Sequence, residues 1–155
     1  MIICRLIIAL LTTLLSIQCQ PQQETPEFSV TEDRKSVEAI LNILDDNSIT
    51  TKDKMEVWVD DLVHMAPNHP IITDKPALIA HINNEKKYGI TDMHHQIREM
   101  HSYAEIVVMH GKVTGTFYPA NGAVSNDFST KNLFIFRRIQ DNSLKIWKVI
   151  FNMTS

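Results

Sequence analysis

Apolar and polar residues alternate at helical spacing in the part of the chain that follows residue 29. In TEDRKSVEAILNILDD (residues 31–46), Thr31 is a candidate N-cap and acidic residues occupy the first turn. Four apolar residues of this segment fall on one face: Val37, Ile40, Leu41 and Leu44. The pattern predicts an amphipathic helix that buries this face against the rest of a domain.

Two further segments carry helical signals. TTKDKMEVWVDD (residues 50–61) has Thr51 as a possible cap. Apolar residues at helical spacing, which continue to the next position, would form its buried side: Met55, Trp58, Val59 and Leu62. KPALIAHINNEKKYG has Pro76 in its first turn and Gly89 just past its end, an asymmetry that is typical of helix starts and stops. Both segments therefore predict short helices.

The second half of the chain is richer in β-branched and aromatic residues. With the turn sequences PANG and QDNS, it predicts three antiparallel strands: IVVMHGKVTGTFYP, NLFIFRRI and SLKIWKVIFN. LVHMAPNHPIIT, before the third predicted helix, predicts two shorter strands around a turn flanked by proline. Arg137 and Arg138 are neighbours on one strand, so alternation sends them to opposite faces, where we expect salt bridges and no anion site.

The composition is that of a globular protein with room for one domain: 155 residues, of which 44% are hydrophobic and 21% charged. Lys and Arg are scattered and the formal net charge is -3, so a nucleic-acid partner is not expected. Both cysteines, Cys4 and Cys19, precede the predicted domain. This excludes a cysteine nucleophile, a disulfide or a zinc thiolate within the domain.

Residues 1–19 predict an export signal. Arg5 is followed by an apolar run from Leu6 to Ile17, which is too short for a comfortable membrane span. Residues 20–29 are polar with two prolines and predict a tether, which leaves residues 30–155 as the domain. We therefore expect an extracytoplasmic protein.

LLSIQC within this signal resembles a bacterial lipobox. That resemblance implies that Cys19 is lipidated, becomes the first mature residue and attaches the protein to a membrane. Gln18 stands where a lipobox normally has a small residue, so cleavage by an ordinary signal peptidase, with secretion of the protein, is the alternative.

The order helix, helix, hairpin, helix and then strands resembles the nuclear-transport-factor-2-like superfamily, in particular its SnoaL-like and ketosteroid-isomerase-like branch. The resemblance covers roughly residues 31–152 and depends on three stretches: VWVDDLVHMAPNHPIITDKPALIAHI, VVMHGKVTGTF and FIFRRIQDNSLKIWKVIFN. It implies an α+β fold in which a cone-shaped, curved antiparallel sheet wraps around N-terminal helices. It also implies an apolar pocket inside the cone and a homodimer.

TDMHHQIREMH (residues 91–101) fits a helix or a strand by its spacing, and the resemblance favours a strand. On a strand His95, Glu99 and His101 would share one face. Because residues four apart on a strand are separated by about 13 Å, His95 and Glu99 cannot bind one ion together. A metal would need partners such as His64 or His110 from neighbouring strands, so we expect no metal and no cofactor.

His95 and Glu99 remain candidates for acid–base chemistry on the concave face, where burial would raise the pKa of a carboxyl group. The alternative is that the histidines of this segment are solvated residues of a strand edge. Asp61 and His64 are the other polar candidates, since in the resembling family their helix-to-strand corner opens on the pocket. Asp61 could instead end a helix, and His64 could hydrogen-bond a backbone carbonyl.

The ketosteroid-isomerase mechanism requires a carboxylate base, a tyrosine and a protonated acid. The position expected for the base is Ala66, and no tyrosine lies in the first predicted helix. The strand expected to supply the acid has apolar residues there: Leu133, Phe134 and Ile135. Steroid isomerisation by that mechanism is therefore not expected.

Apolar residues would line the pocket that the resemblance implies: Trp58, Met65, Phe117, Phe134, Trp147, Val149 and Phe151. Such a lining favours a small apolar or amphipathic molecule, although each residue could equally be plain core. Two hypotheses follow. The first is an exported module that binds such a molecule, or a protein partner, through the cone without catalysis. The alternative is a metal-independent lyase, isomerase or hydrolase that uses His64, Asp61, His95 or Glu99.

Overall fold

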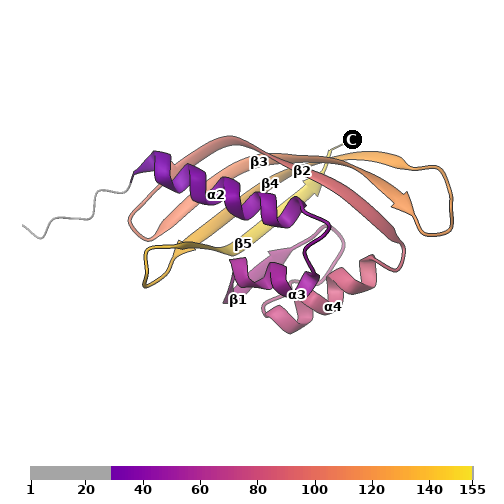
Figure 1. The fold of residues 1–155 in the computed structure, drawn as a ribbon, viewed down its shortest axis with the longest axis horizontal. Helices are drawn as coiled ribbons and strands as arrows, with labels where there is room; N and C mark the ends of the chain where they lie inside the picture. Colours follow the sequence, from indigo (N-terminus) through magenta and orange to yellow (C-terminus); the bar gives the residue numbers. More distant parts are fainter. Residues whose placement is uncertain (1–28, 155) are drawn as a thin grey trace, which may run out of the picture.

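The computed structural model describes residues 29–154 of the chain (Figure 1). In chain order its elements are α2 (Val30–Asp45), α3 (Thr51–Lys54), the 3-10 helix η1 (Met55–Val57), β1 (Trp58–Met65), α4 (Lys75–Glu85), β2 (Gly89–Ser102), β3 (Ile106–Pro119), β4 (Asn126–Arg138) and β5 (Leu144–Met153). The expected export signal, Cys19 and residues 20–28 of the expected tether lie outside the described residues. The domain boundaries therefore stay predictions.

The strands form one curved, unclosed sheet in the order β1-β5-β4-β3-β2, with helix α2 lying across it (Figure 1). Neighbouring strands from β2 to β5 are antiparallel, as predicted, whereas β1 pairs with β5 in parallel. The α+β fold with a curved sheet and N-terminal helices is thus confirmed, and it departs from an antiparallel pattern only at β1. β1 and β5 lie far apart in the sequence, so no local pattern of residues predicts that they pair.

Hydroxyl side chains cap the first two helices one or two residues earlier than predicted. Ser29 Oγ accepts a hydrogen bond from the Glu32 N–H at 3.3 Å, so Ser29 caps α2 in place of Thr31. Thr50 caps α3 in the same way, in place of Thr51. Adjacent hydroxyl residues qualify equally by sequence, and only the extended backbone at the true cap distinguishes them.

The predicted second helix is confirmed for residues 51–57, which form α3 and η1, but it ends earlier than expected, because β1 begins at Trp58. The register of β1 shifts between Trp58 and Val63, and Trp58, Val59 and Leu62 are all buried although the segment is extended. An irregular strand thus imitates helical spacing, which explains the error. Of the two short strands predicted next, the first is the end of β1 and the second is reduced to a single bridge between His64 and Ile72.

Strand β2 confirms the strand prediction for residues 91–101, but the predicted shared face is wrong beyond Ile97. Ile97 is paired with Gly111 and Glu99 with His110, so one extra residue is inserted between Ile97 and Glu99. Such a bulge reverses the alternation that follows it. Glu99 and His101 therefore lie on the exposed side, with 62% and 57% of their side chains accessible, and hydrogen-bond each other at 2.8 Å.

One hydrophobic core joins the helices to the sheet. Its most deeply buried side chains are Val37, Leu62, Leu78, Val107, Met109, Phe136 and Ile146. They come from α2, α4 and four strands, and each contributes about 1.5–3 kcal/mol by burial. The core therefore fixes where α2 and α4 lie relative to the sheet, and with them the side chains described below.

The neighbouring arginines of β4 diverge and form salt bridges, as predicted. Arg137 contacts Asp61 of β1 through two hydrogen bonds of 2.8 and 2.9 Å. Arg138 contacts both oxygens of Asp33 of α2 at 3.0 Å, in a pair whose side chains are 9% and 6% exposed. The second pair ties the first helix to the far end of the sheet.

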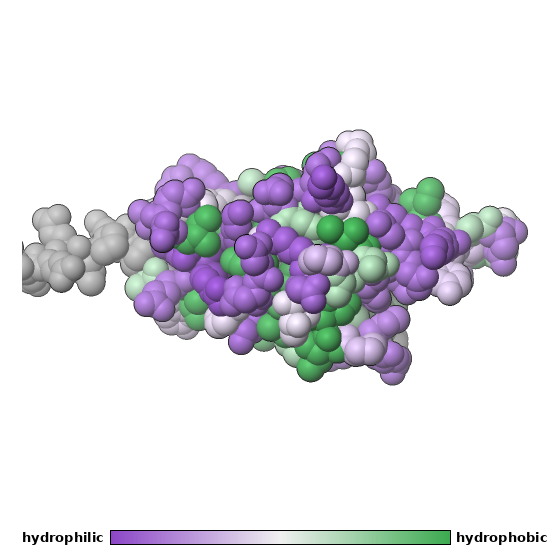
Figure 2. Space-filling view, turned by 90° about the horizontal axis from the view of Figure 1, so that it is seen from below, coloured by the Kyte–Doolittle hydropathy of each residue, from purple (hydrophilic) through white to green (hydrophobic). Residues whose placement is uncertain are grey.

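The surface is mostly hydrophilic, but apolar residues gather in the middle of the face seen in Figure 2. The large exposed apolar side chains of the described residues include Ile71 and Ile90. Within residues 29–154, no helix is long and apolar enough to cross a membrane.

Candidate functional site

A histidine and an aspartate form a buried pair where α2 ends against β2. The backbone N–H of His95 donates to Asp45 Oδ2 at 2.9 Å, and Nδ1 of its ring contacts Asp45 Oδ1. The side chains are only 7% and 15% exposed. Because an ionised carboxylate only accepts hydrogen bonds, Nδ1 carries the proton in this arrangement.

The position of Asp45 in α2 gives this pair its electrostatic character. Asp45 is the last residue of the helix, where the macrodipole is negative and disfavours a carboxylate. A carboxylate at that place needs a hydrogen-bond donor or a cation beside it. His95 contacts the Asp45 carboxylate through its backbone N–H and through its ring Nδ1. His94, which is mostly exposed, lies 3.9 Å away through its Nδ1. The sequence thus places an acid at an unfavourable helix end and a histidine opposite it.

The other side of the His95 ring faces apolar surroundings. Phe134 of β4, which is 2% exposed, meets the ring edge to face with 5.6 Å between centroids. Among residues 29–154, no protein group hydrogen-bonds Nε2 of His95. This nitrogen therefore keeps its lone pair and can accept a proton.

His64 is the second predicted candidate, and it lies in a different cluster. Its ring lies 6.3 Å from Trp58, 5.7 Å from Phe151 and 5.8 Å from His81, measured between centroids. Burial, helped by the nearby His81 and His69, lowers the pKa of His64 to about 4. Its Nδ1 is buried, and within the described range it has no hydrogen-bond partner, so the expected bond to a backbone carbonyl is not formed through that atom.

Asp61 does not join His64. It is bound to Arg137, which lies 4.0 Å from the centroid of the Trp147 ring. The hydrogen bond from Arg137 holds the pKa of Asp61 below its usual range. Asp61 therefore belongs to an ion pair on the exposed side of β1, and Trp147 lies with the cations Arg137 and Lys148.

The apolar residues expected around a pocket divide into two groups. Trp58, Phe134 and Val149 are buried core residues. The other four residues are partly accessible: Met65, Phe117, Trp147 and Phe151. The first group fits the alternative that these side chains are plain core, and the ligand-binding role of all of them stays a prediction.

No protein-family model matches the chain, and no curated protein matches it in sequence. Solved structures do match. A ketosteroid isomerase-like protein from Erwinia carotovora atroseptica superposes with a TM-score of 0.70 at 20% identity, over 79% of this chain and 93% of that one. A hexachlorocyclohexane dehydrochlorinase, LinA-type3, from Novosphingobium barchaimii gives a TM-score of 0.71 at 13% identity, over 81% and 88%.

A nuclear transport factor 2-like superfamily protein from Salmonella enterica serovar Typhimurium matches over 81% of this chain and 90% of its own, with a TM-score of 0.65 at 9% identity. The fold is nuclear-transport-factor-2-like. The resemblance noted in the sequence is therefore confirmed at the level of the fold.

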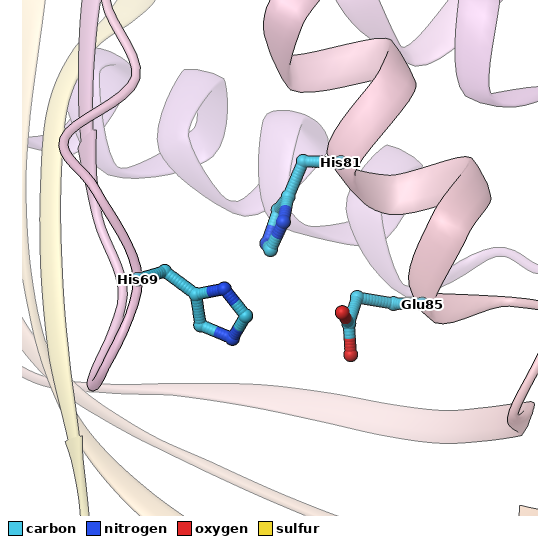
Figure 3. Close-up of side chains that lie close together, drawn as sticks. All are labelled: His69, His81 and Glu85. Atoms are coloured by element: carbon cyan, nitrogen blue, oxygen red, sulfur yellow. The ribbon is translucent and has the colours of Figure 1, made fainter.

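Two features of this nuclear-transport-factor-2-like domain were missed in the sequence. The first is Asp45, which was not singled out, although an acid in the last turn of a helix is itself a signal, because it opposes the macrodipole. The second is a cluster of His69, His81 and Glu85 (Figure 3). Its signal was the spacing of four between His81 and Glu85 on a predicted helix, which places both on one face.

Proposed function

We propose that this protein is an acid–base enzyme of the lyase class, in which His95 is the general base and Asp45 orients it. The observation that carries the proposal is the double contact between the two residues in a buried position. Nuclear-transport-factor-2-like neighbours that include hexachlorocyclohexane dehydrochlorinases support elimination in preference to hydrolysis.

The geometry suits abstraction of a proton from carbon. Nε2 of His95 takes the proton, the electrons of the broken C–H bond form a new double bond, and the leaving group departs with its bonding pair. The imidazolium that results is stabilised by the Asp45 carboxylate, which keeps Nδ1–H directed at itself. Phe134 keeps one side of the His95 ring dry.

The other predicted catalytic residues have no place in this reaction. Glu99 lies on the exposed side of β2, and Asp61 is held by Arg137. His64 belongs to the cluster around Trp58 and His81. The elimination therefore needs only one histidine and one carboxylate.

Replacement of His95 by glutamine tests the proposal. With hexachlorocyclohexane and a panel of small β-halogenated and β-hydroxylated carbonyl compounds as probes, we expect wild-type turnover, followed by halide release or by absorbance of the new double bond. His95→Gln should lose on the order of 10²–10⁴ in rate, because general-base catalysis contributes that much. Asp45→Asn should also lose rate, since the imidazole is then no longer held in one tautomer.

His101→Gln is the matched control, because His101 is an exposed histidine of the same strand. It should keep the wild-type rate. If His95→Gln kept the rate as well, or if the wild type bound the probes without converting any, the protein would be the non-catalytic binding module that the sequence also suggested.

We also propose that this domain acts outside the cytoplasm as a homodimer, exported by residues 1–19 and anchored through Cys19 or released. Support comes from the apolar run and the lipobox-like LLSIQC. A mass spectrum of the protein from its native host checks the processing. An uncleaved N-terminus would contradict export by this signal.

A further inference from the structure

Three side chains that can bind a metal converge between α4 and the turn that follows β1. The His95–Asp45 pair is held by other elements, α2 and β2. His81 and Glu85 lie one turn apart on α4, and His69 lies in the segment between β1 and α4. One ligand atom from each lies within 4.8 Å of the others. Figure 3 shows the three side chains directed into one common space.

The backbone holds His69 in this place. Asn68 has a left-handed conformation with φ of 60°, and the His69 N–H donates to the Ala66 carbonyl at 3.4 Å, which closes a turn. Below the turn, two hydrogen bonds of 2.8 and 3.0 Å join His64 to Ile72. The ring of His69 consequently meets that of His81 with 4.8 Å between centroids.

The three side chains face one another but form no ion pair with one another within the described residues. Behind them lies His64, whose buried Nδ1 has no hydrogen-bond partner in the same range and whose ring contacts that of His81. Two imidazoles and a carboxylate gathered in this way are a set of ligands that zinc binds in proteins.

We propose that His69, His81 and Glu85 bind one zinc-class divalent transition ion. Two imidazoles and a carboxylate are ligands that zinc prefers, whereas calcium and magnesium require oxygen. Zinc–ligand bonds of about 2.0–2.1 Å in a tetrahedron place ligand atoms about 3.3 Å apart, so the side chains need to close by no more than about 1.5 Å. His69 and Glu85 are exposed, so rotation of their side chains is the movement that would close the site.

Three protein ligands leave a fourth position for water. The ion would join the turn after β1 to helix α4, two segments that meet here through the rings of His69 and His81. It would thus fasten α4 to the edge of the sheet. The elimination proposed for His95 does not pass through this ion.

Isothermal titration of the untagged, chelator-treated protein with zinc chloride tests the site. We expect one ion per chain for the wild type and at least about tenfold weaker binding for His69→Ala and for Glu85→Gln. Cobalt should bind the same site and give the visible absorption of a tetrahedral complex, while magnesium should not compete. Zinc should also raise the melting temperature of the wild type, but not that of a double variant that combines His69→Ala with Glu85→Gln.

His101→Gln provides the control, because His101 and Glu99 form an exposed histidine–carboxylate pair that, among residues 29–154, has no third metal-binding group close to it. It should bind zinc as the wild type does. Since His69 and Glu85 are exposed, both variants should keep the wild-type circular dichroism. Unchanged zinc affinity in the double variant, or no binding by the folded wild type, would overturn the proposal.

Discussion

At the scale of single residues, the protein contains two histidines whose surroundings push them toward different tasks. His95 has a carboxylate at Nδ1 and an aromatic neighbour, so its other nitrogen is available as a base. His64 is enclosed by aromatic rings and has two further histidines close by, so it stays neutral near pH 7. Both were singled out in the sequence, but their different partners, Asp45 and His81, come from segments distant in the chain.

His64 makes the stability of the fold depend on pH. Its pKa of about 4 in the folded protein lies below the ordinary 6.5, so between these values the unfolded chain takes up a proton that the folded one does not. The free energy of unfolding should therefore fall by up to about 3 kcal/mol as the pH decreases from 6.5 to 4.

Denaturant titrations of the wild type and of His64→Phe, with chelator present, check this prediction. The variant should lose that part of the pH dependence, because it cannot bind the proton, while the nearby His81 and His69 are kept. Parallel stability curves for the two proteins between pH 7 and 4 would show that burial does not perturb His64.

At the scale of elements, irregular strand pairing in β2 and β1 decides which side chains share a face. Alternation along β2 could be predicted correctly as far as Ile97, which includes His95. The residue inserted before Glu99 could not, since a bulge depends on the pairing with β3. The same limit explains β1, where a register shift gave an extended segment the spacing of a helix.

Two neighbouring arginines allow a matched test of how α2 is held. Asp33→Ala removes a buried carboxylate that accepts two hydrogen bonds from Arg138, and should cost about 3–5 kcal/mol of stability. Asp61→Ala removes the partner of Arg137 at an exposed place and should cost under about 1 kcal/mol. Chemical denaturation of both variants measures the difference. Equal losses would mean that the buried pair does not fasten the helix to the sheet.

At the scale of the whole molecule, the order of helices and strands was sufficient to predict the fold. Amphipathic α2, the proline at the start of α4 and the β-rich second half each left a local signal. The parallel pairing of β1 with β5 left none, because it arises only when the sheet brings distant segments together. The spacing of His81 and Glu85 placed those two residues on one helix face, but no local pattern indicated that His69 joins them.

The account depends most on the claim that Asp45 fixes the proton of His95 on Nδ1 and leaves Nε2 as the base. Long-range proton–nitrogen correlation by NMR on the labelled protein at neutral pH reads this tautomer directly. We predict a protonated Nδ1 and an unprotonated Nε2 in the wild type, and loss of that preference in Asp45→Asn. A wild-type His95 with its proton on Nε2 would contradict the account, since that nitrogen could not then accept a proton from a substrate.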